Sequence, residues 1–107
     1  MKINITPALS FSDVIMVPKY SSISSRTSVD LTSKLTEKIS IGCPILSTNM
    51  ATVTEADMMI AMWKLGGAGI LHRFLPEKRL LEETTVAKEA GVSPLIISIG
   101  VKVVNLS

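Results

Sequence analysis

The spacing of apolar residues changes character near Pro44, and from there three short apolar runs alternate with two amphipathic stretches. We expect the runs to be strands buried on both faces, because such strands read as nearly continuous apolar sequence. A strand–helix–strand–helix–strand order with short connections predicts parallel pairing through right-handed crossovers. The three predicted strands are Pro44–Ser47, Ala68–Leu71 and Leu95–Val101.

The stretch between the first two runs predicts a helix. Thr54 is a good N-cap residue, and Glu55 and Asp57 follow in the first turn, where the helix dipole favours acidic side chains. Gly66 or Gly67 ends this helix. The predicted buried face has the i, i+3, i+4, i+7 spacing and consists of Met58, Ala61, Met62 and Leu65.

A second helix is predicted between the second and third runs. Pro76 suits the first helical position, where no backbone N–H is needed, and Gly91 closes the helix. The apolar side of this helix is predicted to be Leu80, Leu81, Thr84, Ala87 and Ala90.

The residues before Pro44 follow a different pattern. Residues 1–20 are an apolar lead-in, and residues 21–28 are a polar loop. Val29–Leu31 and Ile39–Ile41 then alternate apolar and polar positions, which predicts two short strands joined by a turn near Thr36–Lys38. We therefore expect a β-hairpin ahead of the first parallel strand.

Composition narrows the class of protein. The chain has 107 residues, 47% of them hydrophobic, and its net charge of +2 is spread along the sequence. One domain at most fits this length, and no basic stripe indicates a nucleic-acid partner. No apolar run approaches the roughly 20 residues of a membrane span, and the N-terminus lacks the build of a signal peptide. A single cysteine, Cys43, suits the cytoplasm, and one cysteine with one histidine argues against a metal site.

The segment that follows Pro44 presents the clearest candidate site. Three apolar positions lead into Thr48, Asn49 and Met50, and a helix begins soon after. Parallel strands of an α/β barrel deliver residues to the ligand-binding face in this way. A hydroxyl can hydrogen-bond a ligand, and a methionine can lie against a flat ring. The structural alternative is that Thr48 and Asn49 only satisfy loop backbone groups while Met50 fills the core.

A series of short motifs runs along essentially the whole chain. They are Phe11-Ser-Asp-Val14, Val17-Pro-Lys19, Ser25-Arg26 with Val29-Asp30-Leu31, Asn49-Met50 with Thr52-Val53, Gly66-Gly67-Ala-Gly69-Ile70, His72-Arg-Phe74 and Ser98-Ile-Gly-Val-Lys102. In this order and spacing they resemble the IMP dehydrogenase/GMP reductase family of purine nucleotide oxidoreductases. The resemblance implies an α/β fold class, the N-terminal portion of a TIM (β/α)8 barrel, with about three βα units after an N-terminal β-hairpin. It implies one partial domain over 1–107, with the lead-in and hairpin in 1–43 and the first three barrel strands with two helices in 44–107.

The resemblance also implies a purine mononucleotide substrate. Many IMP dehydrogenases insert a pair of regulatory modules after the second barrel helix, whereas Ala90-Gly91 passes directly into the third strand here. That feature, with Asn49-Met50, His72-Arg-Phe74 and Ser98-Ile-Gly-Val-Lys102, resembles GMP reductase more closely, an enzyme that converts GMP to IMP and ammonia with NADPH. The stretch Thr52–Arg73 resembles IMP dehydrogenase equally, so oxidation of IMP to XMP with NAD is the alternative. Relatives are typically tetramers, which implies a homo-oligomer.

A third hypothesis is a truncated, non-catalytic remnant or assembly fragment. In the family a cysteine nucleophile attacks C2 of the purine, and hydride passes between the adduct and a nicotinamide cofactor. That cysteine belongs to a loop later in the barrel, so Cys43, which precedes the first barrel strand, is not its counterpart. We therefore expect no catalytic residue in this chain and no turnover by the isolated chain. An open sheet edge further predicts oligomerisation or aggregation.

The resemblance assigns substrate contacts to Thr48, Asn49 and Met50. Ala51 departs from the acid or amide usual at that position, which removes an anchoring hydrogen bond and puts full activity in question.

Cofactor contacts are implied for three residues elsewhere. Ser25 and Arg26 resemble a pair that reaches the dinucleotide bound to a neighbouring subunit, and an arginine beside hydroxyls suits phosphate. Arg73 stands where relatives often carry a lysine that contacts the cofactor. His72 can be either a ligand-facing or a structural histidine. The glycines of Gly66–Gly69 are not a dinucleotide fingerprint, because they end a helix and enter a strand.

Overall fold

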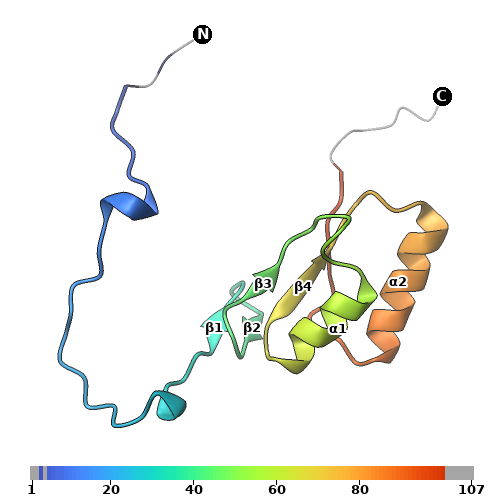
Figure 1. Ribbon diagram of the computed structural model, residues 1–107. Helices are drawn as coiled ribbons and strands as arrows, with labels where there is room; N and C mark the ends of the chain where they lie inside the picture. The colour runs from blue at the N-terminus through green and yellow to red at the C-terminus, as the bar shows by residue number, and fades with distance from the viewer. Residues whose placement is uncertain (1–2, 4, 101–107) are drawn as a thin grey trace.

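The computed structural model describes residue 3 and residues 5–100. These residues form an extended arm (residues 5–32), a β-hairpin, and a strand–helix–strand–helix–strand unit (residues 44–98), here called the βαβαβ unit (Figure 1). In chain order the elements are η1 (Phe11–Asp13), η2 (Arg26–Ser28), β1 (Ser33–Lys34), β2 (Ser40–Ile41), β3 (Leu46–Ser47), α1 (Ala56–Lys64), β4 (Ala68–Leu71), α2 (Glu77–Glu89) and β5 (Ile96–Ile97).

The three strands of the βαβαβ unit form a parallel sheet in the order β3-β4-β5, which confirms the predicted pairing. β4 has the predicted bounds, Ala68–Leu71. β3 is shorter than the prediction at its start. Pro44 has no backbone N–H, and the amide of Ile45 donates to the Cys43 carbonyl (2.8 Å), so neither residue donates to the ladder.

β5 is likewise shorter than the predicted Leu95–Val101. Its ladder covers Ile96–Ile97, and the last contact is the Ser98 amide donating to the Leu71 carbonyl at 2.8 Å. β4 ends at Leu71, so it offers no strand partner to residues beyond Ser98. Val101 lies outside the described residues.

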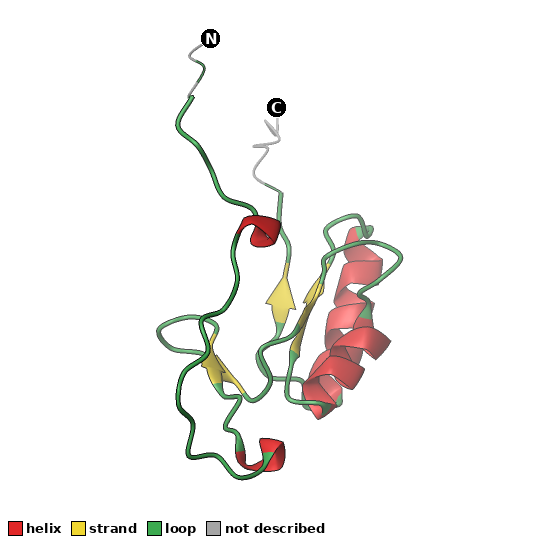
Figure 2. Ribbon diagram, turned by 60° about the vertical axis from the view of Figure 1, so that its left-hand side comes forward, coloured by secondary structure: helices red, strands yellow, loops and turns green. Residues whose placement is uncertain are grey.

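Both helices cover the same face of the sheet, and the core lies between them and the strands (Figure 1, Figure 2). Met59, Leu71 and Ala87 have no exposed surface and form its centre. Because side chains alternate along a strand, the register turns Leu46 and Ile70 to the opposite face. That second face is apolar, and Leu46 is 43% exposed there.

The buried face of α1 differs from the prediction. Ala56 and Met59 are buried, whereas Met58 is 38% and Leu65 is 77% exposed. α1 is apolar on most sides, so a 3.6-residue period fits more than one face. Close contact with β4 selects the face of Met59: a side chain at Gly69 would place its Cβ 2.9 Å from the Met59 Cα.

α2 begins one residue later than predicted. Pro76 is its N-cap, with the extended backbone angles φ −57° and ψ 150°, and Glu77 is the first helical residue. Ala87 is buried and Leu80 packs on the core, as predicted, but Leu81 is 62% exposed. Both helices end as predicted at glycines with left-handed backbone, at φ 85° for Gly66 and 88° for Gly91.

The hairpin is confirmed, although its first strand is displaced. β1 pairs antiparallel with β2, and the Ile39 carbonyl accepts the amides of Leu35 and Thr36 across the turn. Val29 and Leu31, predicted as strand, stand outside the ladder. The Asp30 carboxylate accepts the Thr32 amide at 2.9 Å, and this local bond competes with strand pairing.

The arm runs away from the sheet (Figure 1). Every described residue before Ser33 is exposed. The radius of gyration is 18.9 Å, against about 13 Å expected for a compact domain of this length. In the part of the chain that the structure describes, no helix has the length and apolar character needed to cross a membrane.

Candidate functional site

Most of the candidate residues predicted from the sequence gather, with Ser98, where the three parallel strands end. Thr48, Asn49 and Met50 follow β3, Arg73 follows β4, and Ser98 follows β5. The arrowheads of the strands point to the same edge of the sheet (Figure 2). The Asn49 side-chain amide donates to the Ser98 hydroxyl at 3.0 Å, a contact between residues 49 positions apart. This bond joins the loops after the first and third strands at the edge where parallel α/β sheets bind ligands.

The first of these loops presents its side chains to solvent. Met50 is 54% exposed and therefore does not fill the core. The Asn49 amide bonds Ser98 rather than the backbone of its own loop. The Thr48 hydroxyl makes no hydrogen bond within the described residues. All three side chains are exposed, and their role as ligand contacts stays a prediction.

Thr54 does not cap α1, contrary to the prediction. The N-cap residue is Glu55, and Thr54 turns its hydroxyl back to the β3 loop, 2.9 Å from the Ser47 hydroxyl and 2.5 Å from the Thr48 carbonyl oxygen. The free amide of Ala56 instead donates to a carboxylate oxygen of Glu83 at 2.9 Å. A side chain of α2 thus caps α1, although the two residues are 27 positions apart in the sequence.

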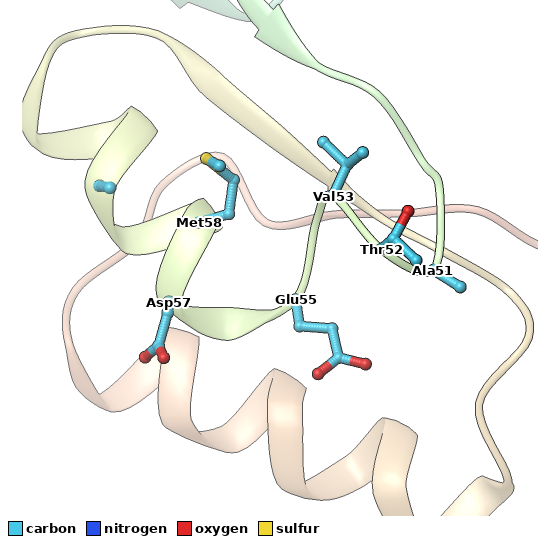
Figure 3. A pocket seen from close by; sticks show the side chains of 7 residues that line it. Ala51, Thr52, Val53, Glu55, Asp57 and Met58 are labelled. Carbon is cyan, nitrogen blue, oxygen red and sulfur yellow. The ribbon is translucent and has the colours of Figure 1, made fainter.

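His72 belongs to a network of side chains beneath the edge. It is 2% exposed, its Nδ1 accepts the Phe74 amide at 3.2 Å, and its Nε2 lies 3.2 Å from Glu55. With Nδ1 acting as acceptor, Nε2 carries the proton and donates to the carboxylate. The other Glu55 oxygen accepts from Arg79 at 3.1 Å, and Figure 3 shows Glu55 turned toward α2. Both ring nitrogens are occupied, so His72 is a structural histidine.

Arg73, in contrast, is exposed. Its guanidinium carbon lies 5.1 Å from the centre of the Phe74 ring, a distance typical of a cation–π contact. A Cβ on Gly100 would lie 3.3 Å from a guanidinium nitrogen of Arg73, which places this cation beside the end of β5. The predicted cofactor residue therefore shares the edge with Asn49 and Ser98.

Ser25 and Arg26 lie elsewhere. The Ser25 hydroxyl accepts the Thr27 amide at 3.3 Å and caps η2, which begins at Arg26. η2 lies toward the end of the sheet opposite the arrowheads (Figure 1, Figure 2). The structure does not bring this pair together with Arg73, so its role as a cofactor contact stays a prediction.

A hollow of about 460 Å³ lies beside the same loop (Figure 3). Its lining includes Ala51 and Val53 from the loop and Met58 from α1. None of Thr48, Asn49, Met50 and Arg73 lines it. The hollow is therefore distinct from the edge where Asn49 meets Ser98.

Comparison with known proteins identifies the family. Residues 8–93 match the family model described as the IMP dehydrogenase / GMP reductase domain. The chain belongs to this family. The inosine-5'-monophosphate dehydrogenase of Nitrosopumilus maritimus is 49% identical over 83 residues, which is 78% of this chain and 17% of that protein. The enzyme of the same name from Aquifex aeolicus is 41% identical over 98 residues, or 92% of this chain and 20% of that protein.

A solved GMP reductase structure is similar in fold. This is the Trypanosoma brucei GMP reductase in complex with guanosine 5'-triphosphate, with a TM-score of 0.70 and 36% identity over 75% of this chain and 19% of that one. The chain thus spans about a fifth of the length of these IMP dehydrogenase and GMP reductase relatives.

The family match includes most of the candidate residues but leaves one out. It extends over Ser25, Arg26, Arg73 and the loop after β3, whereas Ser98 lies beyond residue 93. Sequence reasoning used Ser98 only as part of a family motif and did not propose it as a site residue, because its partner Asn49 is remote in sequence. The available signal was its position: a short polar residue directly after an apolar strand, as in Thr48 after β3.

Cys43 lies at the opposite end of β3 from this edge. It precedes the strand, its amide donates to the Gly66 carbonyl at 2.8 Å, and it is partly buried. Gly66–Gly69 joins α1 to β4, in agreement with a turn and against a dinucleotide fingerprint. Cys43 is the one cysteine among the 107 residues, so this member of the IMP dehydrogenase / GMP reductase domain family has no thiol at the candidate site.

Proposed function

We propose that the chain supplies one wall of the nucleotide site of a purine nucleotide oxidoreductase, as the first part of a (β/α)8 barrel. The observation that carries the proposal is the Asn49–Ser98 bond, which joins two strand-end loops at one edge. Barrel enzymes bind their substrates at that edge. Exposed Thr48, Asn49 and Met50 are the proposed contacts to the purine mononucleotide.

The chemistry of each side chain fits this role. The Thr48 hydroxyl can donate to or accept from a sugar or base, and the Met50 thioether can lie on a purine face. Asn49 gives one amide hydrogen to Ser98 and keeps its carbonyl oxygen and second amide hydrogen for a ligand. Ala51 offers no polar atom beyond its backbone, which separates this chain from relatives with an acid or amide there.

Arg73 is the proposed cofactor contact on this edge. Its exposed guanidinium suits the phosphates of a nicotinamide dinucleotide, which exchanges a hydride with the purine when bound. Ser25 and Arg26 are proposed to meet the dinucleotide of a neighbouring copy, in keeping with their distance from Arg73. A cation at this position serves either NADPH or NAD.

The favoured reaction is reduction of GMP to IMP and ammonia with NADPH. Similarity to the Trypanosoma brucei GMP reductase structure supports it, as do the motifs at Asn49-Met50 and His72-Arg-Phe74. Oxidation of IMP to XMP with NAD is the second candidate, because curated relatives such as those of Nitrosopumilus and Aquifex are named IMP dehydrogenases.

The 107-residue chain is expected to bind without turnover. Family chemistry needs a thiol at the purine, and Cys43 stands at the far end of β3. Spectrophotometry at 340 nm with GMP and NADPH should show no oxidation of the cofactor above a blank. Turnover that persists after repurification and is lost in Thr48→Tyr would contradict this expectation.

Calorimetric titration with GMP, IMP, NADPH and NAD tests the binding function. Met50→Ala should weaken mononucleotide binding roughly tenfold, because it removes about 1.5 kcal/mol of apolar contact. Met58→Ala is the matched control, an exposed methionine on α1 away from the edge. Tighter binding of GMP and NADPH supports GMP reductase, and tighter binding of IMP and NAD supports IMP dehydrogenase. Binding of no nucleotide contradicts the proposal.

The exposed apolar sheet face supports self-association. Leu46 and Ile70 lie on the face that the helices do not cover, and β3 and β5 are both edge strands within the described residues. Sedimentation velocity should therefore show a homo-oligomer or aggregate. A stable monomer with one cooperative melt would contradict this part of the proposal.

A further inference from the structure

Thr54 stands between the candidate loop and α1, and it is fully buried at 0% exposure. We propose that Thr54 is a positioning residue, which holds Thr48–Met50 in the conformation that meets the nucleotide. The inference rests on the proposed function for the nucleotide contact. The restraint that Thr54 places on the conformation of Thr48–Met50 is a property of the folded chain and can be measured without a ligand.

The hydrogen bonds of Thr54 reach both ends of the segment. Its hydroxyl lies 2.5 Å from the Thr48 carbonyl oxygen, and its backbone amide donates to the Met50 carbonyl at 3.1 Å. The Val53 amide donates to the same Met50 carbonyl at 3.0 Å. Both carbonyls are thus held inward, while the side chains of Thr48, Asn49 and Met50 stay exposed.

The direction of the hydroxyl bonds follows from counting hydrogens. A threonine hydroxyl has one hydrogen, and a carbonyl oxygen can only accept. The Thr54 hydroxyl is the donor in both contacts, toward the Thr48 carbonyl oxygen at 2.5 Å and toward the Ser47 hydroxyl at 2.9 Å, and its one hydrogen favours the shorter bond to the carbonyl. Within this arrangement valine, which has the same shape as threonine, cannot replace it.

The two residues next to Thr54 in this arrangement, its hydrogen-bond partner Ser47 and the following Glu55, are themselves closely held. Gly69 of β4 has no side chain, and a Cβ there would lie 3.1 Å from the Ser47 hydroxyl oxygen and 2.9 Å from the Met59 Cα. The next residue, Glu55, is bonded to His72 and Arg79. The loop is therefore fastened at the residue that joins it to the helix.

Three variants distinguish the contribution of the Thr54 hydroxyl from that of the shape of its side chain. Thr54→Val removes the hydroxyl and keeps the shape, and Thr54→Ser keeps the hydroxyl and removes the methyl group. Thr52→Val is the matched control, because Thr52 is exposed and its hydroxyl has no hydrogen-bond partner among the described residues. Each is compared with the wild type by amide hydrogen exchange and by titration with GMP and with IMP.

Thr54→Val should speed exchange of the Val53 and Thr54 amides and weaken nucleotide binding, each roughly tenfold or more, because the part-buried Thr48 carbonyl loses its donor and the turn that follows it loosens. Exchange of α1 amides reports global stability and corrects for it. Thr54→Ser and Thr52→Val should stay within about twofold of the wild type in both measurements.

Two results overturn the inference. One is wild-type exchange and affinity in Thr54→Val, and the other is an equal loss in Thr54→Ser and Thr54→Val, which would assign the effect to packing. If the wild type binds neither nucleotide, the proposed function and the ligand part of this inference fall together. Selective loss of protection at the Val53 and Thr54 amides in Thr54→Val would then still support the conformational role of Thr54.

A measurement on the wild type guards against a variant that does not fold. A buried hydroxyl hydrogen in a short bond exchanges slowly with solvent, so the Thr54 hydroxyl proton should be visible by NMR. A signal that exchanges at the rate of a solvent-exposed threonine would overturn the donor assignment.

Discussion

The arm and the βαβαβ unit are both rich in large apolar side chains, yet they have opposite environments. Phe11 is 98% and Met16 is 94% exposed in the arm, whereas Met59 and Leu71 are completely buried in the unit. The difference is one of connectivity. In the βαβαβ unit, each helix returns the chain to a neighbouring strand of the same sheet. The backbone hydrogen bonds of the arm, in contrast, are mainly local bonds within single 3-10 turns. Apolar content becomes a core only where the topology supplies a second surface.

The largest test of this comparison truncates one apolar residue in each region. Met59→Ala should lower the free energy of unfolding by about 2–5 kcal/mol, because it leaves a cavity between α1 and β4. Phe11→Ala should change it by less than about 0.5 kcal/mol, as expected for an exposed side chain. Urea unfolding measures both. Equal losses would show that the arm packs on the unit in solution.

A second test probes the close approach of α1 to β4. Gly69→Ala places a methyl group against the Met59 backbone and should cost about 1–3 kcal/mol by overpacking. Gly100→Ala is its control, since the nearest atom is the end of the Arg73 side chain, which can move. Thermal melts should shift only for Gly69→Ala. An unshifted melt would mean that helix and strand lie further apart.

A third test addresses the cap that α2 provides to α1. Glu83→Ala removes the acceptor of the Ala56 amide and should cost about 1–2 kcal/mol. The ion pair with Arg79 adds little, because Arg79 is half exposed. Glu82→Ala, one residue earlier and exposed, should be within about 0.5 kcal/mol of the wild type. If both variants melt alike, the cap does not contribute.

The smallest expected effects are in the arm. The Ser10 amide and hydroxyl bond the Asp13 carboxylate and lower the pKa of that carboxyl below its ordinary 3.8, and the Thr32 hydroxyl and amide lower the pKa of Asp30. A lowered pKa means that these turns are stabilised above that pH and lose the contribution as pH falls through the lowered value. NMR titration should find both pKa values below 3.8. Ser10→Ala should raise only that of Asp13, and an unchanged Asp13 value would contradict the turn.

The parallel strand order and the C-terminal ends of both helices were predictable from the sequence. Ala68–Leu71 was recognisable because an apolar run of strand length stood between glycines and a histidine, and Gly66 and Gly91 required left-handed backbone. The buried face of α1 was mispredicted because apolar residues surround that helix. Only contact with β4 distinguishes Met59 from Met58.

The candidate site was partly predictable. Thr48–Met50 and Arg73 follow strands, so their shared edge follows from parallel topology alone. Two partnerships could not be foreseen, because Asn49 with Ser98 and Ala56 with Glu83 join residues 49 and 27 positions apart. Thr54 matched the sequence pattern of an N-cap. Its sequence position could not show that its hydroxyl turns away from α1 and bonds the Thr48 carbonyl instead.

Arg79 also has a consequence for how this sequence can diverge. Its guanidinium bonds both Glu55 (3.1 Å) and Glu83 (2.8 Å). A neutral residue at position 79 would leave two carboxylates facing the same space without a shared cation. Natural variants that lose Arg79 should therefore carry a compensating change at Glu55 or Glu83, so the three positions form one unit of covariation that links the start of α1 to α2.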